Sequence, residues 1–132
     1  MPTRRQIVMA TAVLVFAPGL AVADDLTPPE TVVSELLAAM EVNDAYRIRT
    51  VFAEDASHTY GDRSPKTGED FRAWLASDII EPHGRVDGAE LAGDGNAVVV
   101  TGQYRNDDGY SSAADFLMTV EDGRIISWQM RY

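Results

Sequence analysis

Two side chains capable of acid–base chemistry, His58 and Tyr60, stand two residues apart in the sequence. In an extended strand, residues at this spacing point to the same side. A neutral imidazole can act as a base near pH 7, and a phenol can donate a hydrogen bond to a developing oxyanion. The pair is therefore the candidate for catalysis. The alternative is structural: the sequence offers no identifiable acidic partner for His58, and both side chains could complete the rim of a core with ordinary hydrogen bonds.

Other reactive patterns are missing from the sequence. The chain has two His and no Cys, without the ligand spacing of a zinc site, so we expect no metal. It has no phosphate-binding Gly-rich loop and no assignable Ser-His-Asp arrangement, so we expect no cofactor. His83, between Pro82 and Gly84, is expected to be a solvated loop residue.

The elements that position these side chains are clearest in the last third of the chain. Three Asp-Gly dipeptides stand fourteen residues apart between segments rich in Val, Phe, Trp and Tyr, namely Asp94-Gly95, Asp108-Gly109 and Asp122-Gly123. Asp-Gly between apolar runs indicates a hairpin, because Gly accepts the positive φ of a tight turn. The pattern predicts a four-stranded antiparallel meander that begins near Arg85.

Loop length decides which residues of this meander share a face. Three-residue loops at 107–109 and 121–123 align apolar residues, whereas a two-residue loop at the latter mixes polar with apolar ones. The predicted inner face contains Val98, Val100, Phe116, Met118, Val120, Ile126, Trp128 and Met130, with Tyr104 and Tyr132 toward its rim. A two-residue loop at Asp94-Gly95 adds Ala89 and Leu91. The outer face is polar except for Val99, Leu117 and Ile125.

Two glycines of the meander carry further expectations. Gly88 indicates a bulge, which leaves open the face on which Asp87 lies. Gly102, opposite Ala114, removes side-chain volume from the centre of the inner face. Because filled cores prefer larger residues, this favours a real cavity.

Three helices are predicted ahead of the meander. Thr27 and Glu30 form a capping box around Pro28 and open a helix with an apolar stripe of Val32, Val33, Leu36, Leu37 and Met40. Asn43 or Asp44 caps a second, short helix whose inner side is Ala45, Ile48, Val51 and Phe52. A strand over 56–61 follows. A third helix runs from Thr67 to Pro82, with Phe71, Trp74, Leu75 and Ile79 inward. The fold class is α+β.

Residues 1–23 are predicted to be a cleavable export signal. Arg4 and Arg5 precede an apolar core too short for a stable membrane anchor, and small residues before Asp24 fit a cleavage site. The paired arginines leave the twin-arginine and general secretory routes open. We expect a periplasmic or secreted protein, with residues 24–132 as one domain and no membrane association after cleavage.

The charge narrows the range of partners. Removing the two arginines of the signal takes the net charge from −10 to −12. Such a surface repels a phosphate backbone and anionic lipid, so nucleic-acid binding is not expected.

The order of elements resembles the nuclear-transport-factor-2-like superfamily, which includes SnoaL-like polyketide cyclases and ketosteroid isomerases. The resemblance rests on 52–56 leading into a strand, Gly68 opening the third helix, 93–96 before a Val-rich strand, and 122–125 before the last strand. It spans essentially the whole mature chain. It implies a cone-shaped pocket fold, in which three helices lean on a bent antiparallel sheet, and dimerisation through the outer sheet face.

The catalytic groups of the known members are not matched. In ketosteroid isomerases the general-base Asp aligns with Tyr60, the oxyanion-hole Tyr with Leu36 and the protonated Asp with Phe116. The Asp-Arg-Asp array of limonene epoxide hydrolase is also absent from the predicted inner face. Of the dehydratase groups, His58 alone has a counterpart.

Three functions remain open. The first is an exported protein that binds a small, largely apolar molecule in its pocket. The second is a lyase, dehydratase or isomerase that uses His58 and Tyr60. The third is a dimeric interaction module of the cell envelope. The predicted ligand-binding residues are His58, Tyr60, Trp74, Val100, Tyr104, Phe116, Met118, Trp128 and Met130.

Overall fold

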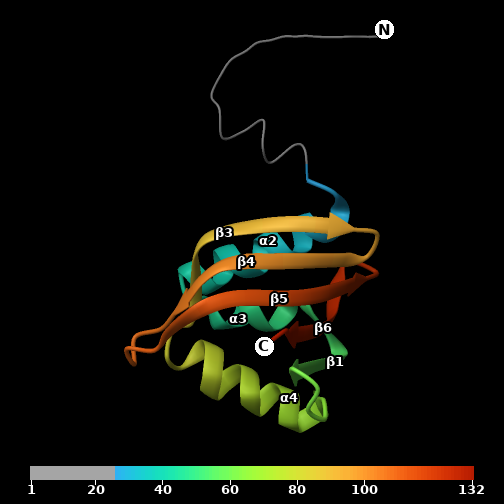
Figure 1. Ribbon diagram of the computed structural model, residues 1–132. Helices are drawn as coiled ribbons and strands as arrows, with labels where there is room; N and C mark the ends of the chain where they lie inside the picture. The colour runs from blue at the N-terminus through green and yellow to red at the C-terminus, as the bar shows by residue number, and fades with distance from the viewer. Residues whose placement is uncertain (1–25) are drawn as a thin grey trace, which may run out of the picture.

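The structure is a computed structural model that describes residues 26–132, and the predicted signal at 1–23 lies outside this range. The described chain folds as helices on a curved sheet (Figure 1), and the sheet has six strands, which confirms the α+β class. The helical segments are α2 (Pro28–Glu41), α3 (Ala45–Thr50), α4 (Gly68–Trp74) and the π-helix η1 (Leu75–Ile80). The strands are β1 (Phe52–Tyr60), β2 (Lys66–Thr67), β3 (Arg85–Asp94), β4 (Ala97–Arg105), β5 (Ser111–Glu121) and β6 (Arg124–Met130).

Helix α2 begins with the predicted capping box. The Thr27 amide donates to Glu30 Oε1 at 2.9 Å, and the Glu30 amide donates to Thr27 Oγ1 at 3.3 Å. The other carboxylate oxygen of Glu30 accepts from the Gly93 amide at 3.0 Å. These bonds, those from Thr27 first, hold the pKa of Glu30 below its ordinary value. The cap therefore also attaches the start of α2 to the end of β3.

The sheet has the order β2-β1-β6-β5-β4-β3 and is mixed. Strand β1 pairs with β6 in parallel. A parallel pair needs a long connection, and here the chain between the two strands includes the rest of the meander. The neighbours within the meander of β3 to β6 are antiparallel, as predicted, and β2 also pairs with β1 in an antiparallel way. The placement of Phe52 on the second helix is wrong: Phe52 is the first residue of β1 and pairs with Ile125.

The β4–β5 register is as predicted, with Val100 opposite Phe116 and Gly102 opposite Ala114. The β5–β6 register is not: Met118 lies opposite Trp128 instead of Ile126. The chain turns at a two-residue loop, and a bulge beside Thr119 and Val120 restores the alternation that such a loop alone would break. Consequently Ile125 is buried and Ile126 is half-buried, the reverse of the prediction.

The turn before β4 lies one residue later than predicted, because Asp94 pairs with Ala97. The expected bulge at Gly88 is confirmed, with φ 62° at this residue and a register shift between Asp87 and Glu90. Asp87 lies on the outer face, where its carboxylate pairs with Arg105 at 2.6 Å. The two inner positions predicted on β3, Ala89 and Leu91, are partly buried against the core.

Gly102 serves the packing of β3 against β4. A Cβ at this position would lie 2.8 Å from both the Asp87 carbonyl oxygen and Val86 Cγ1, and the residue has φ 149°. The interpretation that Gly102 opens the cavity is therefore wrong. Glycine is present because the bulged strand β3 approaches the backbone here.

The helices cover one face of the sheet. In Figure 1, α2 and α3 lie behind β3, β4 and β5, and in the described part of the chain no helix covers the front of these strands. The largest side chains of the core that are below 2% exposed are Trp128, Phe116, Leu36, Met40 and Ile48. Within residues 26–132, no helix combines the length and the apolar character needed to cross a bilayer.

Candidate functional site

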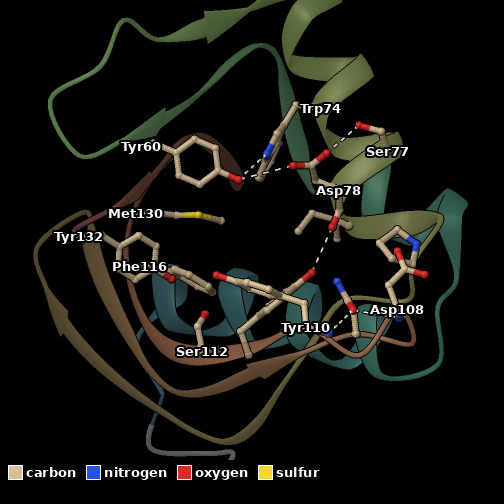
Figure 2. A pocket seen from close by; sticks show the side chains of 14 residues that line it. Tyr60, Trp74, Ser77, Asp78, Asp108, Tyr110, Ser112, Phe116, Met130 and Tyr132 are labelled. Carbon is tan, nitrogen blue, oxygen red and sulfur yellow. Dashed lines mark hydrogen bonds between the residues drawn. The ribbon is translucent and has the colours of Figure 1, made fainter.

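A cavity of about 320 Å³ lies between η1 and one end of strands β4, β5 and β6 (Figure 2). Nine of the fourteen lining side chains are aromatic or apolar, while the other five and the tyrosine hydroxyls make a large part of the wall polar. The lining residues are Tyr60, Trp74, Ser77, Asp78, Ile79, Pro82, Tyr104, Asn106, Asp108, Tyr110, Ser112, Phe116, Met130 and Tyr132. A concave site that combines aromatic side chains with polar groups is typical of small-molecule binding.

The cavity includes five of the nine predicted ligand-binding residues: Tyr60, Trp74, Tyr104, Phe116 and Met130. The other four are 0% exposed and do not reach it: His58, Val100, Met118 and Trp128. All four lie on the inner face of the sheet, as predicted. They lie deeper along their strands, however, where the helices cover the sheet and side chains fill the space. The ligand role of the first five stays a prediction.

His58 is packed inside the core. Its ring stacks on the Trp74 ring with centroids 3.5 Å apart, and the Tyr60 ring meets it edge-on at 4.5 Å. Neither imidazole nitrogen has a hydrogen-bond partner among the described residues. Burial, with the Lys66 charge as a second cause, lowers the pKa of His58 to about 3. The ring is therefore neutral near pH 7 and is separated from any molecule in the cavity. This geometry gives no support to the catalytic role predicted for His58.

Tyr60 and Asp78 form the polar end of the cavity (Figure 2). The Tyr60 hydroxyl accepts from Trp74 Nε1 at 3.3 Å and donates to Asp78 Oδ2 at 3.5 Å. Burial raises the pKa of Tyr60 above its ordinary value, so the phenol is protonated at neutral pH and acts as the donor. Ser77 Oγ donates to Asp78 Oδ1 at 2.8 Å. The Asp78 carboxylate is thus held by two neutral hydroxyls.

The backbone beside Asp78 is also fixed. The Tyr104 hydroxyl donates to the Asp78 carbonyl oxygen at 3.0 Å, and this tyrosine is buried with its pKa raised. Asp78 belongs to the π-helix η1, in which the Glu81 amide donates to the Ala76 carbonyl oxygen, five residues earlier. Short π-helical segments are frequent at functional sites.

Sequence reasoning missed Asp78, although a signal was present. The predicted third helix has its apolar face at Phe71, Trp74 and Leu75. Residue 78 follows these at spacings of seven, four and three, which places it on the same helical face. An acidic residue on an otherwise apolar face was the observation that could have identified it.

The opposite rim is formed by the β4–β5 loop. Asn106 Oδ1 accepts from the amides of Asp108 and Tyr110, and the Asp107 amide donates to the Pro82 carbonyl oxygen. The Asp107 carboxylate also pairs with Arg85 at 3.0 Å and with His83 at 3.5 Å. These contacts attach the loop to the end of η1 and thereby position Tyr110 and Asp108. His83 is half-buried and bonded to the Glu41 carbonyl oxygen, so the expectation of a solvated residue is wrong.

The family profile of the SnoaL-like domain matches residues 33–128. The chain belongs to this family. The predicted resemblance to the nuclear-transport-factor-2-like superfamily is thereby confirmed. The match includes strands β1 to β5, the helical segments α3, α4 and η1, and most of α2 and β6. Among curated proteins, none matches the chain closely enough to count as a relative.

Solved structures share the fold at low sequence identity. A nuclear-transport-factor-2-like protein from Cytophaga hutchinsonii has 17% identity and a TM-score of 0.66, over 77% of this chain and 87% of that chain. A Mycobacterium tuberculosis protein in complex with estradiol-17β-hemisuccinate has 15% identity and a TM-score of 0.65, over 81% and 95%. A Sinorhizobium meliloti protein provisionally named a polyketide cyclase has 20% identity and a TM-score of 0.64, over 82% and 97%. At these identities the likeness shows the fold alone.

Potential metal ligands do not cluster in the described part of the chain. No group of three or more His, Asp or Glu side chains in residues 26–132 has an arrangement that could hold a metal ion.

Proposed function

We propose that this SnoaL-like domain binds a small, largely apolar molecule in the cavity beside η1. The observation that carries the proposal is the cavity of about 320 Å³, whose wall combines Trp74, Phe116 and Met130 with a few hydroxyl and carboxylate groups. The Mycobacterium tuberculosis structure with a bound steroid derivative supports the same use of the fold. The alternative of an enzyme that uses His58 as the general base is less well supported, because His58 is buried behind Trp74.

The test is to fill the cavity from one strand. Ser112 lines it from β5, whereas Ser111 is exposed and is not among the lining residues. Successive residues of a strand point to opposite faces, so Ser112→Phe places a ring in the cavity and Ser111→Phe places the same ring outside. With naphthalenemethanol as the probe, calorimetry should show binding to the wild type and to Ser111→Phe. Ser112→Phe should weaken it at least about ten-fold, an estimate from the cost of overpacking.

Two outcomes of this experiment would contradict the proposed binding site. A wild type that binds neither this probe nor others of similar size would contradict the proposed function. Equal affinities in the two phenylalanine variants would show that the probe binds elsewhere on the protein.

We also propose that the outer face of the sheet joins two copies of the chain. Val99 and Leu117 pair directly on this face, are half-buried, and are free of helical cover among residues 26–132. In sedimentation velocity the wild type should behave as a dimer, and Leu117→Asp should weaken association at least about ten-fold by placing a charge in an apolar contact. Tyr46→Asp, on the exposed side of α3, is the control that should leave the dimer intact. A strictly monomeric wild type would exclude this interface.

Export and cleavage after residue 23 stay predictions of the sequence. In that setting the binding protein would act in the periplasm or outside the cell.

A further inference from the structure

The ionisable groups on the cavity wall are of one sign, tyrosines aside. Asp78 lines the cavity from η1 and Asp108 lines it from the β4–β5 loop, and no Arg, Lys or His is among the lining residues that the structure describes. Both residues are exposed to solvent, and a cleft lined by charges of one sign favours a ligand of the opposite charge.

Only four acidic residues of the described chain, Glu69, Asp87, Asp107 and Asp115, pair with a basic side chain, and Asp78 and Asp108 differ from the other unpaired acids in that they line the cavity. Asp87 pairs with Arg105, and Asp115 pairs with Arg131. The carboxylate of Asp107, which is adjacent to Asp108, contacts both the Arg85 guanidinium group and the His83 ring. Within residues 26–132, no basic nitrogen lies within 4.0 Å of the carboxylate of Asp78 or Asp108.

The partners of Asp78 leave its charge in place. Tyr60 and Ser77 donate neutral hydroxyl hydrogens to it, which orient the carboxylate without compensating it. Both donors come from residues that also line the cavity. The site is therefore an oriented anion on an aromatic wall, which is complementary to a positively charged group.

The aromatic side chains strengthen this complementarity. Aromatic faces attract ammonium groups, and indole and phenol rings do so most strongly. Trp74, Tyr104, Tyr110 and Tyr132 line the cavity together with Tyr60. The Tyr60 ring already holds one cation, because the Lys66 ammonium group lies 5.3 Å from its centroid. Lys66 is not among the residues that line the cavity.

We propose that the preferred ligand is an organic cation, in which an apolar body carries an amine or quaternary ammonium group that sits beside Asp78. This inference rests on the proposed function and names the class of molecule for the same cavity. The apolar body lies against Phe116 and Met130, and the charged nitrogen lies between the Asp78 carboxylate and the rings near it. A carboxylate or phosphate in the same place would meet Asp78 without a basic group among the lining residues, since Lys66 and Arg63 line adjoining hollows and not this cavity.

The experiment compares three probes that share a naphthalene skeleton and differ in one group: naphthylmethylamine, which is protonated at pH 7.5, naphthalenemethanol and naphthoate. Calorimetry on the wild type should give the ammonium probe the tightest binding, about five-fold or more tighter than the alcohol, as for an exposed charge pair together with a cation–π contact. Naphthoate should bind the most weakly.

Two variants separate the Asp78 contact from the net charge. Asp78→Asn keeps the shape of the side chain and should remove most of the preference for the ammonium probe, while affinity for the alcohol changes less than two-fold. Asp94→Asn makes the same change in net charge at the opposite end of β4, where Asp94 pairs with Ala97, and should keep the preference.

The outcomes distinguish this inference from the proposed function. Binding of the alcohol with no preference for the ammonium probe, or a preference that survives in Asp78→Asn, would overturn the inference and leave the apolar binding site standing. Failure of all three probes to bind the wild type would overturn both. Equal loss of preference in Asp78→Asn and Asp94→Asn would assign the effect to net charge and would also reject a specific contact at Asp78.

Discussion

The free energy of unfolding should fall by about 2 kcal/mol between pH 7 and pH 5 through His58 alone, and His58→Phe should remove this loss. In the unfolded chain the pKa of His58 is near its ordinary value of 6.5, whereas burial lowers it to about 3 in the folded protein. Between these values the unfolded state binds more protons, so stability decreases as the pH falls. The full contribution is present above about pH 6.5. Each pH unit below that removes about 1.4 kcal/mol until the folded pKa is reached.

The measurement is urea unfolding of wild type and variant at pH 7, 6 and 5. Other groups also titrate in this window, so the readout is the difference between the two proteins, in which their contributions cancel. Phenylalanine retains the stacking on Trp74 but adds one heavy atom, and His58→Leu is a second variant that avoids overpacking. Parallel pH dependences in the wild type and both variants would show that folding does not lower the pKa of His58.

Gly102→Ala should destabilise the domain by about 2–4 kcal/mol, through a backbone conformation that disfavours a side chain and through overlap with β3. The new Cβ would lie 2.8 Å from the Asp87 carbonyl oxygen, which belongs to backbone and cannot rotate away. Thermal and urea unfolding at pH 7 would measure the loss.

Gly109→Ala is the matched control for this prediction. Gly109 also has positive φ, 91°, but a Cβ there would meet no atom within 4 Å. It should therefore cost about 1 kcal/mol, which reflects the backbone conformation alone. A Gly102→Ala cost no greater than that of Gly109→Ala would contradict the close approach of β3.

Much of the sheet could be predicted because local signals specify it. Asp108-Gly109 fixes the β4–β5 loop, and the alternation of apolar residues then sets the register that the structure shows. The β5–β6 register could not be obtained in this way, because the bulge near Val120 depends on the pairing itself. The parallel contact of β1 with β6 depends on tertiary packing across the whole meander.

The sequence predicted which face of the sheet carries the candidate site, but it did not predict where along the strands the cavity lies. Alternation identifies Phe116 and Met118 as neighbours on the inner face. However, Phe116 lines the cavity, whereas Met118 is completely buried in the core. The difference between these two positions depends on where the helices that cover the sheet end. The spacing of apolar residues along a strand or a helix does not reveal this. His58 attracted attention by its residue type, whereas Asp78, which stands on the apolar side of the predicted third helix, lines the cavity from η1.

The π-helix also bears on how such a cavity can diversify. A π turn contains about one residue more than the α turn that it replaces, so gain or loss of one codon in η1 would rotate the following residues by about 100° around the helix axis. Such a change would move Asp78 relative to Trp74 and leave every strand of the sheet in register. Insertions and deletions in this segment would therefore change which side chains of η1 face the cavity while the pairing of the sheet strands is kept.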